Sequence, residues 1–192
     1  MYAANQTGPW CFQPDAKGNP PGTTFSEDCL HLNVWRVAPH AADSRPAAVM
    51  LFLHGGSFVY GSGADPIYEG SRLAVASGGS VIVVTINYRL GPLGFLVKDP
   101  SGAGGMLGLQ DVVLALRWVQ DNIRSFGGDP ARVTLFGESA GAIGTCVLAR
   151  SPAARGLFDR ALLQSGPCVG PWGPAPVATG VAVRDVMLFG HR

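Results

Sequence analysis

Residues 128–141 read GDPARVTLFGESAG, and this stretch decides the fold. Residues 132–136 have the apolar character of a strand, and a helical stretch follows the last glycine, to about Ala149. Between them lies the pattern G-x-S-x-G, with Ser139 at its centre. Glycines two residues before and two after the serine remove side chains that would clash in a sharp turn. The spacing predicts a strained turn that presents the Ser139 hydroxyl. An incidental serine in a glycine-rich turn is the alternative interpretation.

A second glycine-rich segment, residues 54–57 (HGGS), follows a continuous apolar run at residues 48–53. Such a run is typical of a strand buried on both faces. Acyl transfer to a serine builds an oxyanion, which needs N–H donors that are already in place. We expect Gly55 to shape the turn. The N–H groups expected to form the oxyanion hole are those of Gly56, Ser57 and Ala140. Taken alone, the segment is better interpreted as a loop that needs glycine, but the serine motif downstream favours the functional interpretation.

Strands and helices alternate along the chain. The predicted strands are residues 30–37, 48–53, 80–88, 132–136 and 159–164. The predicted helices are residues 71–77, 109–123 and the stretch after the serine motif. Residues 91–108 are rich in glycine and are expected to form a loop, and residues 127–130 (GGDP) are expected to end the second helix. In the first strand, one face is expected to carry Leu30, Leu32 and Val34. The other face is expected to carry His31, Asn33 and Trp35. This order predicts an α/β fold with a mostly parallel sheet and helices on both faces.

Composition sets the class of protein. The 192 residues suit one compact domain, and 47% hydrophobic residues are enough for a sizeable core. The net charge is +1 with no basic block, which argues against nucleic acid and anionic membrane surfaces as partners. Apolar runs such as residues 81–86 are too short to span a bilayer. The first residues have neither the basic start nor the apolar stretch of a secretory signal.

Four cysteines leave the redox chemistry partly open. Cys11 and Cys29 bracket a turn-rich loop that a disulfide would stabilise, and two free thiols are the alternative. Cys146 lies in a helical stretch and is interpreted as a small buried hydrophobe. Cys168 is assigned no role at this point.

Several stretches resemble the type-B carboxylesterase and cholinesterase-like family. The resemblance extends over nearly the whole chain up to about Gly166 and is highly specific. The matching stretches are residues 126–141, 27–35 (EDCLHLNVW, with His31 where tyrosine is usual), 87–91 (NYRLG), 108–111 (GLQD) and 163–166 (LQSG).

The resemblance implies a partial α/β-hydrolase domain over residues 1–192, with the C-terminal strands missing. It implies a carboxylic ester hydrolase in which Ser139 attacks a small-molecule ester and forms an acyl-enzyme. No metal or organic cofactor is implied. The family's first disulfide falls on Cys11 and Cys29, which points to the secretory route. In the family, the residue at Glu138 lies beside the nucleophile and helps to set the local field, although an incidental polar spacer is the alternative.

The resemblance further suggests a structural ion pair between Arg89 and Asp111, with two solvated charges as the alternative. Two departures from the family are informative. Family members begin several dozen residues before the first disulfide cysteine, so a longer N-terminal part is expected. The loop of residues 11–29 contains no tryptophan, where cholinesterases hold the choline ammonium by cation–π attraction. A choline ester is therefore disfavoured as substrate.

A triad built on this motif follows the order serine, acid, histidine. After Ser139 the chain offers only Asp159, Asp185 and His191. Asp159 is expected to open a strand, Asp185 to lie on a solvated helix face and His191 to lie in a frayed tail. His54 precedes the serine and is expected to be structural.

The chain is thus expected to carry the nucleophile and the oxyanion hole without the catalytic acid and histidine, and to be weak or inactive alone. An adhesion-type, non-catalytic esterase-like module and an inactive truncated product are the alternatives. Adhesion members of the family generally do not keep the serine. The oligomeric state is left open.

Overall fold

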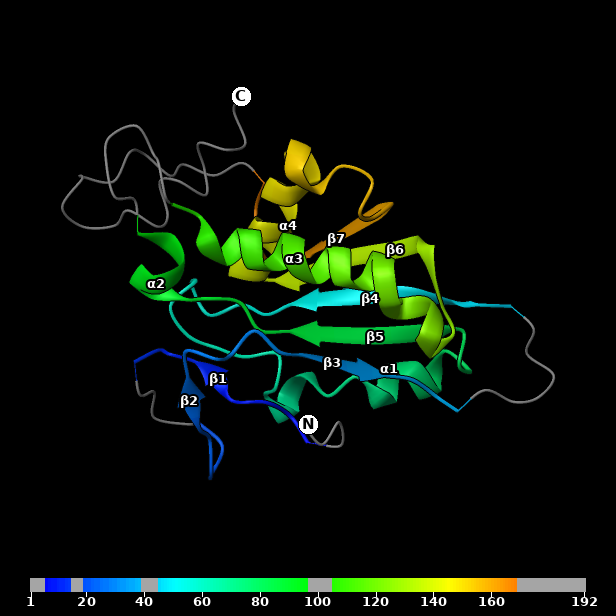
Figure 1. Cartoon of the computed structure of the whole chain (residues 1–192), viewed down its shortest axis with the longest axis horizontal. Helices are drawn as coiled ribbons and strands as arrows, with labels where there is room; N and C mark the ends of the chain where they lie inside the picture. Colours follow the sequence, from blue (N-terminus) through cyan, green and yellow to red (C-terminus); the bar gives the residue numbers. More distant parts are fainter. Residues whose placement is uncertain (1–5, 15–18, 39–44, 97–104, 169–192) are drawn as a thin grey trace.

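A five-stranded sheet forms the centre of the molecule in the computed structural model, which describes residues 6–14, 19–38, 45–96 and 105–168. Its order is β3-β5-β4-β6-β7 (Figure 1). Only β3 runs antiparallel to its neighbour, which confirms the mostly parallel sheet. The strands are β3 (Leu32–Trp35), β4 (Ala47–Leu53), β5 (Val81–Ile86), β6 (Gly128–Glu138) and β7 (Arg160–Gln164).

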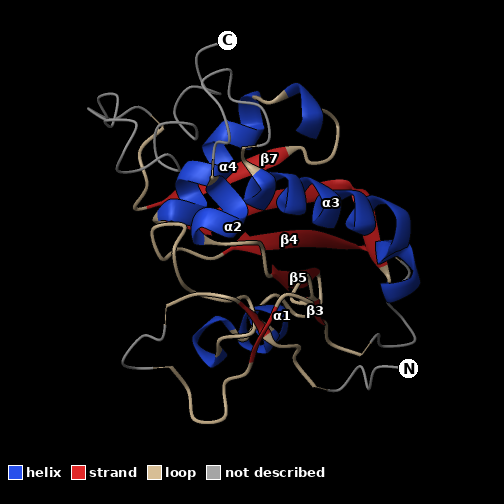
Figure 2. Ribbon diagram, turned by 60° about the vertical axis from the view of Figure 1, so that its left-hand side comes forward, coloured by secondary structure: helices blue, strands red, loops and turns tan. Residues whose placement is uncertain are grey.

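Helices cover both faces of this sheet, as predicted. Figure 2 shows α3 (Leu107–Asn122) and α4 (Ala140–Arg150) on one side and α1 (Ser71–Ala76) on the other. A small parallel pair, β1 (Trp10–Cys11) and β2 (Phe25–Ser26), lies beside the main sheet (Figure 1). The short 3-10 helices are η1 (Pro66–Tyr68), η2 (Ile123–Phe126) and η3 (Pro152–Ala154). The sheet is therefore the middle layer, and its strand ends are left for loops.

The core follows from the apolar runs. Val49, Leu51 and Leu53 of β4 are fully buried, as are Val84 and Ile86 of β5. Parallel strands covered on both faces must be apolar at nearly every position, which explains the continuous runs. Each such side chain stabilises the fold by about 1.5–3 kcal/mol relative to exposure in water. No helix in the described part of the chain is long and apolar enough to cross a membrane.

Two predicted strands differ in detail. β6 begins at Gly128 rather than at Arg132, because Gly127 adopts a left-handed conformation (φ 77°) that ends η2 and turns the chain straight into the sheet. The alternation predicted for residues 30–37 is wrong. All four residues of β3 are half-buried and Leu30 is 44% exposed, because β3 lies at the edge of the sheet.

The prediction that residues 91–108 form only a loop is wrong. Gly91–Phe95 forms the short helix α2, and α3 already begins at Leu107. Pro92 suits the first turn of a helix, where its missing N–H costs nothing. Phe95 is fully buried and anchors α2 against Tyr88 and Phe58. Helix formation here depends on this tertiary burial, which a short glycine-rich sequence does not reveal.

Two disulfides are present. Cys11–Cys29 joins β1 to the segment after β2, with Cα atoms 4.9 Å apart, and confirms the pairing that the resemblance implied. The interpretation of Cys146 as a simple buried hydrophobe is wrong, because it is bonded to Cys168 with Cα atoms 5.5 Å apart. The segment after β7 approaches α4, where Gly166 lies against Ala142, and this path brings Cys168 to Cys146.

Candidate active site

Ser139 occupies a strained turn between β6 and α4. Its backbone dihedrals, φ 53° and ψ −118°, are rare for a residue with a side chain. The N–H of Ser139 donates to the carbonyl of Gln164 on β7 (2.9 Å), and its carbonyl accepts from the N–H of Ile143 (3.1 Å). Hydrogen bonds to two different elements therefore hold the turn in this conformation.

The glycines around Ser139 are steric requirements. A Cβ at Gly137 would lie 2.8 Å from the carbonyl oxygen of Leu53, and a Cβ at Gly141 would collide with the same oxygen. A Cβ at Gly166, just after β7, would lie 2.6 Å from that of Ala142. The turn thus packs directly on the backbone at the end of β4, which explains the glycine spacing of the serine motif.

The segment 54–57 lies against this turn, because β4 pairs in parallel with β6 and Leu53 stands opposite Gly137. A Cβ at Gly55 would lie 3.2 Å from the Cβ of Ser139 and 2.7 Å from Oε2 of Glu138. Glycine is therefore the residue that permits this close approach. The structure brings Gly55, Glu138 and Ser139 into one cluster at the carboxyl ends of the strands.

The backbone of the next residues turns outward. Gly56 and Ser57 both have positive φ angles, 97° and 57°, and the Gly56 carbonyl accepts from Val59 and Tyr60 (2.9 and 3.1 Å). Ala140 is the first residue of α4. Among the described residues, no acceptor takes a hydrogen bond from the N–H groups of Gly56, Ser57 or Ala140. These three N–H groups are therefore not used as donors within the described part of the chain.

His54 is a buried residue that holds the glycine-rich segment 54–57 in place. It is 1% exposed, its ring stacks on Tyr88 with centroids 4.4 Å apart, and its Nδ1 lies 2.8 Å from the Gly55 carbonyl. The Tyr88 hydroxyl donates to the His54 carbonyl (2.8 Å). Burial lowers the pKa of His54 to about 4, against a smaller opposing effect of the hydrogen bond with Gly55. The ring is neutral at pH 7 and has a structural position, as expected.

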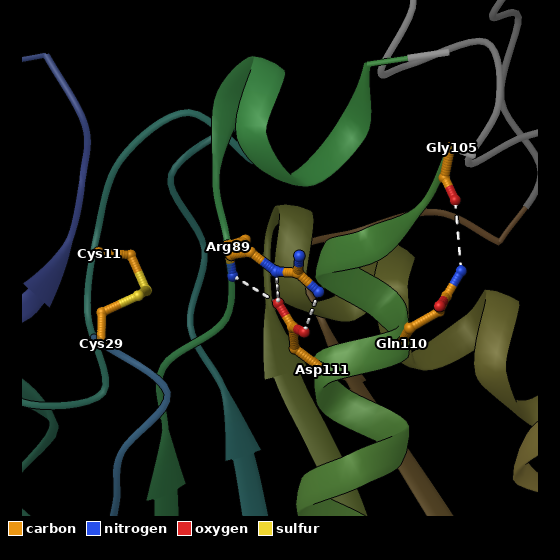
Figure 3. Close-up of polar contacts among 6 residues, drawn as sticks. All are labelled: Cys11, Cys29, Arg89, Gly105, Gln110 and Asp111. Atoms are coloured by element: carbon orange, nitrogen blue, oxygen red, sulfur yellow. Dashed lines mark hydrogen bonds and ion pairs between the residues drawn. A yellow bond between two sulfur atoms is a disulfide. The ribbon is translucent and has the colours of Figure 1, made fainter. Parts of the chain in front are cut away.

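An ion pair fixes the segment that carries Tyr88. Arg89 Nε and Nη2 donate to the two carboxylate oxygens of Asp111 on α3 (2.8 and 2.6 Å), and the Arg89 N–H adds a third bond (Figure 3). Hydrogen bonding to Asp111 raises the pKa of Arg89. The suggested pair is confirmed, and Asp111 is buried while the Arg89 side chain is about one third exposed. The contacts run from α3 through Tyr88 to His54, so they support the glycine-rich segment.

Glu138 is half-buried beside the serine. Its charge acts on Tyr68 of η1. Burial raises the pKa of Tyr68, and the charges of Glu138 and Asp65 raise it further. The side of the site that faces η1 is therefore electronegative. Sequence reasoning assigned no role to Tyr68 or Tyr88, although the motif at residues 87–91 pointed to the second.

Asp159 does not reach the site. It precedes β7, donates its N–H to Val133 (2.9 Å) and pairs with Arg160 (2.8 Å). Arg160 stands opposite Thr134, at the far end of the β6–β7 pair from Ser139. At the rise of a strand, Asp159 lies on the order of 15 Å from the serine. Asp185 and His191 lie outside the described residues.

Comparisons with known proteins identify the family of this chain. The carboxylesterase family model matches residues 1–184. Acetylcholinesterase-1 of Trittame loki is 45% identical over 170 residues, covering 86% of this chain and 30% of that protein. The para-nitrobenzyl esterase of Bacillus subtilis (strain 168) is 50% identical over 143 residues, covering 73% of this chain and 28% of that protein.

The solved structure of a PNB esterase superposes with a TM-score of 0.72 at 48% identity, over 83% of this chain and 32% of that one. The chain therefore spans less than a third of the length of each of these three proteins. With the family match over nearly all of its residues and the α/β-hydrolase architecture of this neighbour, the chain belongs to the carboxylesterase family.

Proposed function

We propose that Ser139 is the nucleophile of a serine carboxylic ester hydrolase and that this chain supplies the nucleophile and the oxyanion hole. One observation carries the proposal. Gly55 lies against Ser139 at the strained turn. The N–H groups of Gly56 and Ser57, which follow Gly55, and of Ala140, which follows Ser139, have no acceptor among the described residues. Family members named for ester hydrolysis support the same chemistry.

In this mechanism the Ser139 hydroxyl attacks the ester carbonyl carbon and loses its proton to a base. The N–H groups of Gly56, Ser57 and Ala140 stabilise the oxyanion. The carbonyl re-forms as the alcohol leaves, which produces an acyl-enzyme, and water then releases the acid. The negative potential of Glu138 favours a neutral or cationic substrate over an anionic one.

The base is the missing part. His54 is buried, neutral and hydrogen-bonded to its own segment, and Asp159 lies at the opposite end of the β6–β7 pair from Ser139. The histidine and acid that complete the site are therefore expected outside the described residues. A chain without them should hydrolyse esters only weakly. We propose a small carboxylic ester without choline as substrate, because residues 11–29 contain no tryptophan to bind an ammonium group.

The test is labelling of the purified chain with a fluorophosphonate probe, compared in Ser139→Ala and in Ser165→Ala, a control at an exposed serine nearby. Labelling lost only in Ser139→Ala would show that Ser139 is activated and that this chain supplies a base. A folded chain that stays unlabelled would support a base supplied from elsewhere. Hydrolysis of p-nitrophenyl acetate at an unchanged rate in Ser139→Ala would overturn the assignment and favour the non-catalytic alternative for this site.

A further inference from the structure

A cavity of about 480 Å³ lies where the parallel strands β4 and β6 begin, at the opposite end of these strands from Ser139. The ends of β3 and η2, the beginnings of β4 and β6, and the glycine turn before β5 surround it. Ser139 follows the other end of β6. Along the paired strand β4, from Ala47 opposite Gly128 to Leu53 opposite Gly137, the two ends are roughly 20 Å apart. The cavity is therefore separate from the proposed active site, and its volume lies in the range of small-molecule sites.

Three arginines line this cavity from three different elements. Arg36 follows β3, Arg45 precedes β4 and Arg124 lies in η2, and all three are exposed. None of them forms an ion pair with a carboxylate in the described part of the chain. The arginine cluster, defined as these three residues, thus carries three positive charges, none of them in an ion pair with a described carboxylate.

The backbone positions two of these arginines near each other. A Cβ at Gly127 would lie 3.5 and 3.6 Å from the terminal nitrogens of Arg36, so the guanidinium of Arg36 lies over Gly127. The N–H of Gly127 donates to the carbonyl of Arg124 (2.9 Å), which ties it to η2. The Arg36 guanidinium therefore lies over the turn that ends η2, the element that carries Arg124.

Asp129 is the one carboxylate among the described lining residues, and it is already engaged. Its two oxygens accept from Arg132 Nε (2.9 Å) and from the Ala131 N–H (3.0 Å). The hydrogen bond from Arg132 holds the pKa of Asp129 below its usual value, and the charge of Arg124 adds to the effect. Among the described lining residues, the three arginines thus outnumber one carboxylate that is already paired with Arg132, so the described lining carries a net positive charge.

The wall beside the cluster is apolar. Phe126, Ile82 and Val37 line it, and Phe126 packs on Trp118 with ring centroids 5.8 Å apart. A bare inorganic anion would leave this wall in contact with water. A ligand with both a charged head and a small apolar body would use both parts of the cavity.

We propose that this cavity binds a small organic phosphate or sulfate monoester, with the tetrahedral anion on Arg36, Arg45 and Arg124 and the apolar body against Phe126 and Ile82. Guanidinium groups suit this head because they donate two parallel hydrogen bonds to a tetrahedral oxyanion. The inference is independent of the chemistry proposed for Ser139.

Isothermal titration calorimetry of the whole chain at low salt tests the proposal. Phenyl phosphate and phenyl sulfate are the probes, and inorganic phosphate and phenol represent the head and the body alone. We expect at least one monoester to bind tenfold or more tightly than either part, and the tighter of the two identifies the head. Absence of binding by both monoesters, or phenol binding as tightly as they do, would overturn the proposal.

Variants locate the binding. Arg36→Ala combined with Arg124→Ala should weaken the affinity tenfold or more, whereas Arg155→Ala, an exposed arginine outside the cavity, and Ser139→Ala should change it less than twofold. Equal weakening in Arg155→Ala would indicate a general charge effect and contradict the site. If the double alanine variant does not fold, Arg36→Lys with Arg124→Lys keeps the charges but not the paired donors. Affinity unchanged in this variant would also contradict the proposal.

Discussion

At the scale of single residues, Ser139 stores backbone strain where the chemistry is proposed. Dihedrals of this kind cost about 1–3 kcal/mol and persist only where the surroundings hold them. Here the Gln164 carbonyl binds the Ser139 N–H, and Gly137 and Gly141 let the turn pack on the Leu53 carbonyl. The serine motif is therefore a packing solution as much as a chemical one.

His54 makes stability depend on pH. Its pKa is about 4 in the folded chain and about 6.5 in an unfolded one, so between these values the unfolded state binds more protons. Stability from His54 is thus complete above pH 6.5 and is lost as the pH falls towards 4. We expect His54 to lower the free energy of unfolding by about 2 kcal/mol between pH 7 and pH 5.

Urea denaturation at both pH values, in the parent chain and in His54→Phe, measures this contribution. Phenylalanine keeps the aromatic contact with Tyr88 but does not titrate. The carboxylates titrate alike in both proteins, so the difference between their pH slopes belongs to His54. Identical slopes would contradict the prediction, because they would mean that the pKa of His54 is the same in the folded and the unfolded chain.

At the scale of elements, parallel pairing brings the functional loops together. β4 and β6 end side by side, so the segment after β4 contacts the turn after β6. The segment after β7 contacts the same turn, because Gly166 lies against Ser139 and Ala142. The two disulfides fix segments that the sheet does not hold. Cys11–Cys29 is buried at both ends, whereas Cys168 of the second disulfide is exposed.

This difference in exposure predicts an order of reduction. With limiting dithiothreitol, Cys146 and Cys168 should be alkylated by iodoacetamide before Cys11 and Cys29, as followed by peptide mass spectrometry. Exposure of one sulfur gives the attacking thiolate access, which the other pair denies. Cys146→Ser with Cys168→Ser should lower the free energy of unfolding by about 3 kcal/mol, because the 22-residue separation is no longer closed in the unfolded chain.

The buried disulfide serves as the internal control for that experiment. Equal alkylation rates of the two pairs would mean that reduction follows global unfolding rather than access to Cys168.

At the scale of the whole molecule, the two edges of the sheet differ. β3 is antiparallel and half-buried, whereas β7 is exposed along most of its length, with Leu162 46% exposed. In the described part of the chain, β7 pairs only with β6. An apolar strand with one free edge is a template for pairing with another chain.

We therefore expect Leu162→Lys to reduce aggregation, measured by light scattering over a range of concentrations. The free energy of unfolding should change by no more than about 0.5 kcal/mol, because the side chain is on the surface. Leu73→Lys on α1 is the matched control, since Leu73 is similarly exposed but lies on a helix. Equal reduction by both variants would point to net charge rather than to the edge of β7.

The sequence by itself determined the parts of this protein that depend on local pattern. The apolar runs predicted β4 and β5, the glycine spacing predicted the turn at Ser139, and the family's motifs predicted the Cys11–Cys29 bond and the Arg89–Asp111 pair. These features are recorded in residues close together or in stretches specific enough to recognise, because backbone sterics and burial act directly on them.

The remaining features depend on contacts that form in the folded chain. Helix α2 forms because Phe95 is buried by distant residues, and Cys146 finds Cys168 because the chain returns over α4 after β7. The arginine cluster forms around one cavity because the end of β3, the beginning of β4 and η2 lie together in the fold. Each of these contacts joins residues far apart in the chain, and their proximity is fixed by the packing of the whole sheet rather than by any local preference.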